Sequence, residues 1–341
     1  MFRCRNLILA LLIQLLFVVG HTSAQKKTYR GEVGGQHIQM ELSREGDVMV
    51  GRYSYDQFQR DLRLEGRLNK DGRLELKETD NKRHTGTFVC KRDEERNPPL
   101  FDLECDWTKP NGSGQVLALL MEQAIDLPKG LSIKPKVINQ RARSVYVSYP
   151  ELISDGTYRV EKFNTRLPTL IRQAMGDIAD AAEKNASFDT NYYVLSANDE
   201  VVSIEMTEYS YLGGAHPNDR WWTFNYDVKN GREFSFNDVF KSDPAFNDAV
   251  KNYAIKEINK LAVQIEEAEA RSEKRAPKRE EEPFMSADEL PEITSWGFTP
   301  KGVTVYFDFP HVAAVFSKVF IPYSEIKSFV KPGTPIARFV Q

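Results

Sequence analysis

From residue 28 to about 122 the chain alternates apolar and polar side chains over short stretches separated by turn-forming residues. Examples are "HIQMELS", "DLRLEGRL" and "GRLELKET", and glycine, asparagine and aspartate are frequent between them. A period of two places successive side chains on opposite faces of a strand, and these turn residues accept the backbone angles that hairpins need. The pattern predicts an antiparallel all-β meander, closed into a small barrel or folded as a sandwich.

The pattern changes after residue 138. Apolar residues recur at helical spacing between Phe163 and Ala181, where Pro168 either kinks the helix or lies near its start. A second helix is predicted from Pro244 at its first position, with Asp243 as the N-cap. Strands are predicted at "SVYVSYPEL", in the pair "NYYVLSANDEVVSIEMTEYSYL", and in hairpins formed by "RWWTFNYDV" with "REFSFNDVF" and by "EITSWGFTPKGVTVYFDF". Strands on either side of the helices predict an α+β arrangement with helices packed on an antiparallel sheet.

These patterns divide the chain into parts. Residues 125–138 contain Pro128, Gly130 and Pro135, and we interpret this segment as a linker. The predicted organisation is a signal peptide at 1–24, an all-β domain at 25–124, the linker, and an α+β region at 139–341. A further division of the last region into 139–212 and 213–341 is left open.

The first 24 residues have the three-part layout of a secretory signal peptide. Arg3 and Arg5 precede an apolar run from Leu7 to Gly20, and the small residues "HTSA" follow. The run of ~14 residues is short of the ~20 that a membrane-spanning helix needs. We expect cleavage after Ala24, no membrane span afterwards, and a periplasmic or secreted protein; an uncleaved anchor is the alternative.

Cleavage would change both the charge and the cysteine count. Two arginines are lost from a formal net charge of −3, which leaves −5 and gives no electrostatic reason to expect nucleic-acid binding. The remaining cysteines are Cys90 and Cys105, both in predicted strands joined by the turn "EERNPP". An even pair in an oxidising compartment predicts a disulfide, worth roughly 3 kcal/mol for a loop of this size; two free thiols are the alternative.

One short stretch combines several conformationally special residues. In "YLGGAHPN", Gly213 and Gly214 can take φ values closed to other residues, Pro217 restricts His216 to extended backbone, and Asn218 can bond nearby backbone. We interpret the stretch first as a rigid joint between two strands in which His216 caps a carbonyl. A ligand contact or a catalytic role for the same loop are the alternatives.

From about residue 144 to 330 the chain resembles the extracellular region of RsiV-type anti-sigma factors and the accessory domains of some peptidoglycan deacetylases. The resemblance is carried by "YSYLGGAHPN", by "FNYDVKNGREFSFNDVF" and by "VYFDFPHVAAVFSKVFIPYSEIKSFV". It implies a binding or sensing module at the bacterial cell envelope. The chain shows neither a sigma-binding segment nor a deacetylase domain, so neither activity is carried over.

Catalytic signals are sparse. The sequence has no H-E-x-x-H, no G-x-S-x-G and no Walker loop. His216 and His311 with Asp219, Asp227 or Asp308 form a candidate acid–base or metal site. Glu205 and Glu208 are poorly placed as a catalytic pair, because residues three apart on a strand face opposite sides.

The leading hypothesis is therefore a non-catalytic envelope protein, without cofactor or metal, that binds a cell-wall glycan or a protein such as a lysozyme-like enzyme. A cell-wall hydrolase using His216 with a nearby aspartate is the second hypothesis, and a ligand in the mouth of the N-terminal barrel is the third. The candidate binding residues are Tyr211, Gly213, Gly214, His216, Asn218, Trp221 and His311.

Overall fold

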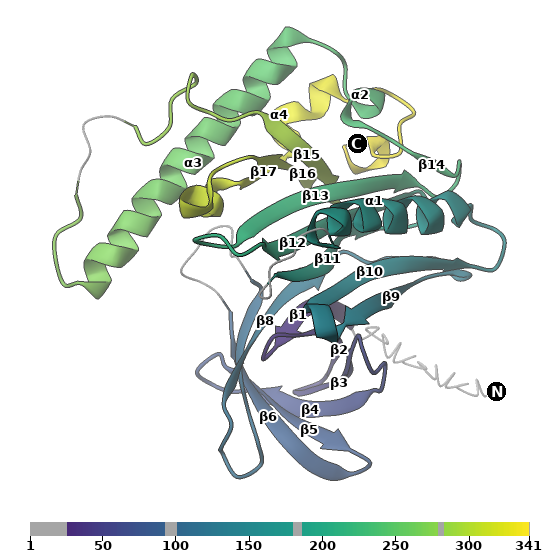
Figure 1. The fold of residues 1–341 in the computed structure, drawn as a ribbon, viewed down its shortest axis with the longest axis vertical. Helices are drawn as coiled ribbons and strands as arrows, with labels where there is room; N and C mark the ends of the chain where they lie inside the picture. The colour runs from purple at the N-terminus through teal and green to yellow at the C-terminus, as the bar shows by residue number, and fades with distance from the viewer. Residues whose placement is uncertain (1–25, 93–100, 180–185, 279–282, 341) are drawn as a thin grey trace, which may run out of the picture.

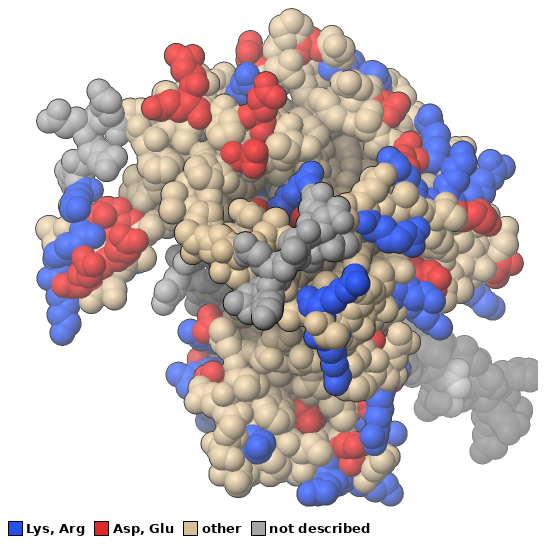
Figure 2. All heavy atoms as spheres, in the orientation of Figure 1, with Lys and Arg blue, Asp and Glu red and all other residues tan. Residues whose placement is uncertain are grey.

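The computed structural model describes residues 26–92, 101–179, 186–278 and 283–340. The predicted signal peptide lies outside these residues. Figure 1 shows an N-terminal barrel at one end of the molecule, a central sheet, and a long helix at the other end. Lys and Arg side chains are interspersed with Asp and Glu over the face seen in Figure 2. Among the described helices, none combines the length and apolar character needed to cross a membrane.

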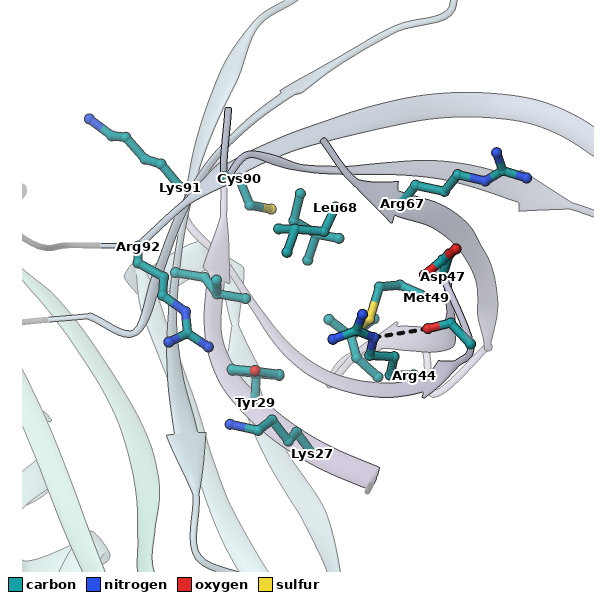
Figure 3. A pocket seen from close by; sticks show the side chains of 15 residues that line it. Lys27, Tyr29, Arg44, Asp47, Met49, Arg67, Leu68, Cys90, Lys91 and Arg92 are labelled. Atoms are coloured by element: carbon teal, nitrogen blue, oxygen red, sulfur yellow. Dashed lines mark hydrogen bonds between the residues drawn. The ribbon is translucent and has the colours of Figure 1, made fainter. Parts of the chain in front are cut away.

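The N-terminal part is a closed antiparallel barrel, which confirms the predicted meander and decides between barrel and sandwich. Each strand pairs with the next, and the last strand pairs with the first through contacts such as Gly31 opposite Leu120. Full closure removes exposed sheet edges. One end opens to a cavity (Figure 3). The strands are β1 (Lys26–Val33), β2 (Gln36–Glu45), β3 (Val48–Tyr55), β4 (Leu62–Leu68), β5 (Leu74–Asp80), β6 (Arg83–Lys91), β7 (Leu103–Thr108) and β8 (Val116–Gln123).

Alternate side chains of these strands fill the barrel. Ile38, Met40 and Phe88 are completely buried, as the period-two pattern requires. One acidic residue, Glu78, is also buried inside, where it accepts hydrogen bonds from the Tyr53 hydroxyl at 2.6 Å and the Trp107 indole at 2.8 Å. Such pairing is what makes a buried carboxylate tolerable.

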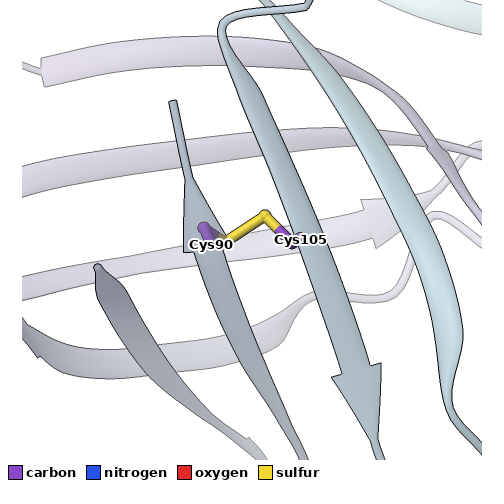
Figure 4. The surroundings of a disulfide bond; sticks show 2 residues. All are labelled: Cys90 and Cys105. Atoms are coloured by element: carbon purple, nitrogen blue, oxygen red, sulfur yellow. A yellow bond between two sulfur atoms is a disulfide. The ribbon is translucent and has the colours of Figure 1, made fainter. Parts of the chain in front are cut away.

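A disulfide joins two adjacent barrel strands. Cys90 in β6 lies directly opposite Cys105 in β7, and their sulfur atoms are bonded (Figure 4). The predicted pairing is confirmed. The turn "EERNPP" that we expected between them falls outside the described residues.

The second part of the chain is built on a six-stranded sheet in the order β14-β13-β12-β11-β10-β9. Helix α1 (Glu161–Ala179) connects β10 to β11, which pair in parallel, and all other neighbours are antiparallel. Its Phe163 and Leu167 pack on a sheet face that includes Phe224 and Tyr226. The strands are β9 (Leu131–Gln140), β10 (Val145–Ser154), β11 (Ser187–Ala197), β12 (Val201–Tyr211), β13 (Asn218–Asp227) and β14 (Arg232–Glu233).

Two details refine the sequence reading. Helix α1 begins seven residues before Pro168, so the proline lies inside the helix. Strand β9 begins at Leu131, within the segment that we read as a linker. The division of the chain into domains stays a prediction.

A three-stranded sheet and the longest helix complete the fold. The sheet contains β15 (Ile293–Phe298), β16 (Gly302–Phe307) and β17 (Lys318–Pro322), and α3 (Pro244–Ser272) packs against it through residues that include Val250 and Ile258. The predicted cap is confirmed, because the Asp243 side chain accepts a hydrogen bond from the Ala245 amide. The short helix α4 (Tyr323–Ile326) follows β17.

The prediction of a strand at "REFSFNDVF" was wrong beyond its first residues. Strand β14 covers only Arg232–Glu233, and α2 (Phe236–Val239) follows. The Ser235 amide and hydroxyl both bond the Asp238 carboxylate, at 2.6 and 2.7 Å, in a capping box that starts a helix. The capping box therefore favours a helix here, although Phe234 and Phe236 alternate with polar residues as they would in a strand.

The barrel and the six-stranded sheet meet around one buried arginine. Arg30 of β1 is 1% exposed, pairs with Asp56, and donates to Ser148 of β10 at 2.8 Å and to Asn191 of β11 at 2.9 Å. The parallel ladder between β10 and β11 ends one residue earlier, at Val147 and Thr190. The guanidinium therefore bonds both strands just where their own pairing stops.

Electrostatics at this junction favour the charged pair. Burial alone would raise the pKa of the Asp56 carboxyl, but the Arg30 charge and the Arg30 and Ser148 hydrogen bonds hold that pKa below its ordinary value. Nearby, His37 of β2 lies 3.0 Å from an Asp189 oxygen and packs edge-on against Tyr146.

We predict that replacing both cysteines by alanine lowers the free energy of unfolding by about 3 kcal/mol, because the loop between them is no longer closed in the unfolded chain. Denaturant titrations followed by circular dichroism measure this. Reduction of the wild-type protein tests the bond without changing side-chain volume, and it should leave the double variant unaffected. An unchanged denaturation midpoint after verified reduction would contradict the prediction.

Arg30→Met should destabilise the protein by about 3–5 kcal/mol, because Asp56 is left buried without its cation. Arg52→Met is the matched control: Arg52 pairs with Glu41 at 2.9 Å on the exposed barrel surface, where such a pair contributes at most about 1 kcal/mol. Arg30→Met/Asp56→Asn should recover part of the loss. Equal losses for Arg30→Met and Arg52→Met would refute a special role for the buried pair.

Candidate functional site

The loop between β12 and β13 holds the histidine motif. Gly213 has φ of +91°, a left-handed conformation that favours glycine. Gly214 does not adopt a left-handed φ, and an added Cβ there would find no atom closer than 3.9 Å; our expectation of special geometry at both glycines was wrong for this one. His216 Nδ1 lies 2.9 Å from the Pro217 carbonyl oxygen. A carbonyl only accepts, so Nδ1 carries the proton.

The structure brings His216 and His311 together, although they lie 95 positions apart in the chain. Their rings are stacked with centroids 5.1 Å apart and planes 6° from parallel. His311 begins the 3-10 helix η2 (His311–Phe316), and its Nδ1 lies 3.2 Å from an Asp219 carboxylate oxygen. Of the three aspartates considered for this site, Asp219 is the one in contact, and its partner is His311 rather than His216.

The geometry limits the chemistry of this cluster. Imidazole nitrogens bind a metal through lone pairs in the ring plane. Two parallel rings therefore do not aim their nitrogens at a common point between them. Within the ranges that the structure describes, no group of three or more His, Cys, Asp or Glu side chains is arranged to hold a metal ion. The Asp219–His311 pair, in contrast, has the form that orients an imidazole as a base.

The other predicted residues lie along the same hairpin. Asn218 begins β13 and is exposed opposite Ser210, whereas Trp221 is half-buried opposite Thr207. Tyr211 is half-buried at the end of β12, opposite Ser187 of β11.

Sequence reasoning missed two exposed apolar side chains next to the histidines. Leu212 is 39% exposed in the loop, and Val312 is 93% exposed beside His311. Tyr209, opposite Asp219 on the neighbouring strand, is 42% exposed. The adjacency of Val312 to His311 was visible in the sequence, but only the stacked histidine rings show that the segment of Leu212 and the segment of Val312 lie close together. We call the set Tyr209, Leu212, His216, His311 and Val312 the hairpin-tip surface.

The acidic residues of β12 do not act together. Glu205 is buried between the two sheets, where it accepts hydrogen bonds from the Tyr306 hydroxyl and from Lys318 Nζ, the latter at 2.6 Å. Burial and the Glu205 charge raise the pKa of Tyr306 well above its ordinary value. Glu205 thus joins the two sheets, and Glu208 faces the opposite side by strand alternation.

Comparison with known proteins relates the central region to a described family. Residues 137–219, which include His216 and Asp219 but not His311, match the family model "Deacetylase PdaC". The chain is 24% identical over 176 residues to the peptidoglycan-N-acetylmuramic acid deacetylase PdaC of Bacillus subtilis (strain 168), a match that covers 49% of this chain and 34% of that protein. The chain thus matches about a third of the length of this curated relative.

Two solved structures are also similar. One is a DUF3298 family protein from Pseudomonas aeruginosa PAO1, with 18% identity and a TM-score of 0.42 over 59% of this chain and 95% of that one. The other is a DUF3298 family member from Bacteroides fragilis NCTC 9343, with 13% identity and a TM-score of 0.37 over 62% of this chain and 98% of that one. The likeness to RsiV-type anti-sigma factors stays a prediction. The likeness to the accessory domains of peptidoglycan deacetylases, predicted over about residues 144–330, is confirmed by the family match for residues 137–219.

Proposed function

We propose that this chain is a non-catalytic binding protein of the bacterial cell envelope and that the hairpin-tip surface contacts a cell-wall glycan. The observation that carries the proposal is the exposure of Tyr209, Leu212 and Val312 in the segments that the stacked histidines bring together. Exposed apolar side chains that cluster, rather than lie scattered, are typical of binding surfaces. A tyrosine presents both an apolar ring and a polar hydroxyl, which suits a sugar face.

The arrangement of the loops supports the same proposal. His216 and His311 stack across two segments, and Asp219 fixes the second ring. The surface is thereby held in one shape before a ligand arrives, which reduces the ordering cost of binding. The named relative acts on peptidoglycan, so the glycan of the cell wall is the first ligand class to test, with a lysozyme-like enzyme as the alternative partner.

Tyr209→Ala/Val312→Ser should weaken retention of the purified protein on insoluble peptidoglycan by about tenfold, or ~1.4 kcal/mol, because it removes the two most exposed apolar or aromatic side chains of the surface. Phe58→Ala is the matched control, since Phe58 is 64% exposed on the barrel. Co-sedimentation at a series of glycan concentrations measures the effect. Equal retention of both variants, or capture of a lysozyme-like enzyme without any glycan binding, would exclude the glycan at this surface.

Hydrolysis is a second candidate function, supported by the Asp219–His311 pair. In such a pair the carboxylate holds the imidazole with Nε2 free to accept a proton from water. The histidine assigned to this role is His311, whereas the sequence alone pointed to His216.

For this candidate, His311→Ala should abolish turnover of soluble peptidoglycan fragments, while His216→Ala should reduce it only through loss of the stacked ring. Product formation by chromatography is the measurement. The absence of turnover by the wild-type protein would eliminate hydrolysis of these fragments, and wild-type turnover by His311→Ala would remove the assignment.

A further inference from the structure

The barrel carries a second candidate site, far in sequence from the hairpin-tip surface. A cavity of about 780 Å³ opens at the end formed by the β2–β3 and β4–β5 turns, at Gly46 and Gly72 (Figure 3). Its size lies within the range of small-molecule sites. The layer beneath it, including Ile38, Met40 and Phe88, is completely buried and closes the barrel interior. The cavity is thus a mouth of limited depth and not a channel.

The inner wall of the mouth is apolar. Leu42, Leu74, Leu103 and the disulfide-bonded Cys90 line it. Leu68 stands at the rim and is 58% exposed. A leucine this exposed beside an apolar wall is available to cover a hydrocarbon group, and burying such surface yields roughly 25 cal/mol per Å².

The rim is strongly basic. Its lining contains five cations and one carboxylate, namely Lys27, Arg44, Arg67, Lys91, Arg92 and Asp47. Two of the cations are neutralised by carboxylates outside the lining: Lys27 pairs with Glu122 at 2.6 Å and Lys91 with Glu104 at 3.2 Å.

Arg44 and Arg92 are placed to receive an anion. In Figure 3 both lie beside the opening, whereas Arg67 points away from it. The Arg44 Nε donates to the Gly46 carbonyl at 2.9 Å, which orients its guanidinium. No carboxylate among the described residues forms an ion pair with Arg44 or Arg92. Two arginines without an ion pair among the described residues present guanidinium donors that match the oxygen atoms of a carboxylate or phosphate.

Tyr29 adds a neutral donor at the same place. Burial, together with the nearby charges of Glu122 and Asp102, raises the pKa of its hydroxyl to about 12. The group therefore keeps its proton at neutral pH and can donate a hydrogen bond.

We propose that the barrel mouth binds an amphipathic anion with a single hydrocarbon chain, its carboxylate or phosphate held by Arg44 and Arg92 and its chain laid against Leu68 and the apolar wall. The two halves of the site each match one half of such a molecule. The proposal concerns the barrel alone and does not depend on the function of the hairpin-tip surface.

Isothermal titration calorimetry on the full chain tests this with four probes below their micelle concentrations: dodecanoate, dodecyl phosphate, neutral dodecyl maltoside and inorganic phosphate. We expect saturable binding of an alkyl anion, and much weaker binding of the neutral detergent and of phosphate alone. The two alkyl anions distinguish a fatty-acid-type from a phospholipid-type head group.

Arg44→Gln/Arg92→Gln should weaken binding of the preferred alkyl anion by about tenfold or more, as the loss of charge-assisted hydrogen bonds implies. Arg63→Gln/Arg83→Gln is the matched control, because it removes the same charge from exposed barrel positions outside the mouth. Leu68→Asp should also abolish binding and, at an exposed position, leave the fold intact. Absence of saturable binding, equal loss in both arginine pairs, or equal affinity for phosphate alone would each overturn the proposal.

Discussion

The arrangement of the whole molecule depends on the burial of the Arg30 guanidinium. A buried cation is costly unless its donors find partners, and here those partners come from three separate segments: Asp56 of the barrel, Ser148 of β10 and Asn191 of β11. They coincide only when the barrel is docked at one position on the sheet. The backbone leaving β8 adds to this constraint, because the Ala124 carbonyl accepts a bond from the Ala197 amide at the end of β11. The barrel is therefore joined to the sheet in one geometry.

Buried charged side chains with hydrogen-bond partners from several strands also occur inside the barrel and between the two sheets. Glu78 inside the barrel and Glu205 between the two sheets are each buried and each bonded to groups from other strands. Apolar packing tolerates many rearrangements, whereas a satisfied polar network accepts few. Polar groups at the barrel centre, at the barrel–sheet contact and at the sheet–sheet contact thus select the register in which the apolar layers pack.

Local patterns predicted much of this fold. Period-two alternation gave the barrel strands, Asp243 with Pro244 gave the start of α3, and the two cysteines gave the disulfide. What could not be predicted depends on distant residues. Alternation along β1 predicts that Arg30 lies on the outer, solvent-facing side of the barrel. The six-stranded sheet packs against that side and buries the residue.

The candidate site likewise combines features that the local sequence shows with features that only the tertiary structure shows. The turn around Gly213 was visible as a motif, but the stack of His216 on His311 results from packing between β13 and η2. The choice of Asp219 over two other aspartates is likewise a matter of tertiary geometry. The sequence singled out His216 and His311 because few histidines were available, but it could not show that Asp219 contacts His311, because spacing along the chain does not report which segments meet.

The two candidate surfaces differ in the kind of interaction they offer. At the hairpin tip Asp219 bonds His311 and the Nδ1 of His216 bonds backbone, and the exposed side chains beside them are apolar or aromatic. At the barrel mouth the apolar wall is continuous with the core, and Arg44 and Arg92 form no ion pair with any carboxylate that the structure describes. Binding at the tip should therefore depend little on salt, whereas the first contact at the mouth is electrostatic and weakens as ionic strength screens exposed charges. Because the charged and apolar contributions are separated in this way, the salt dependence of binding distinguishes the two proposed surfaces: a ligand whose affinity falls as salt rises fits the mouth and not the tip.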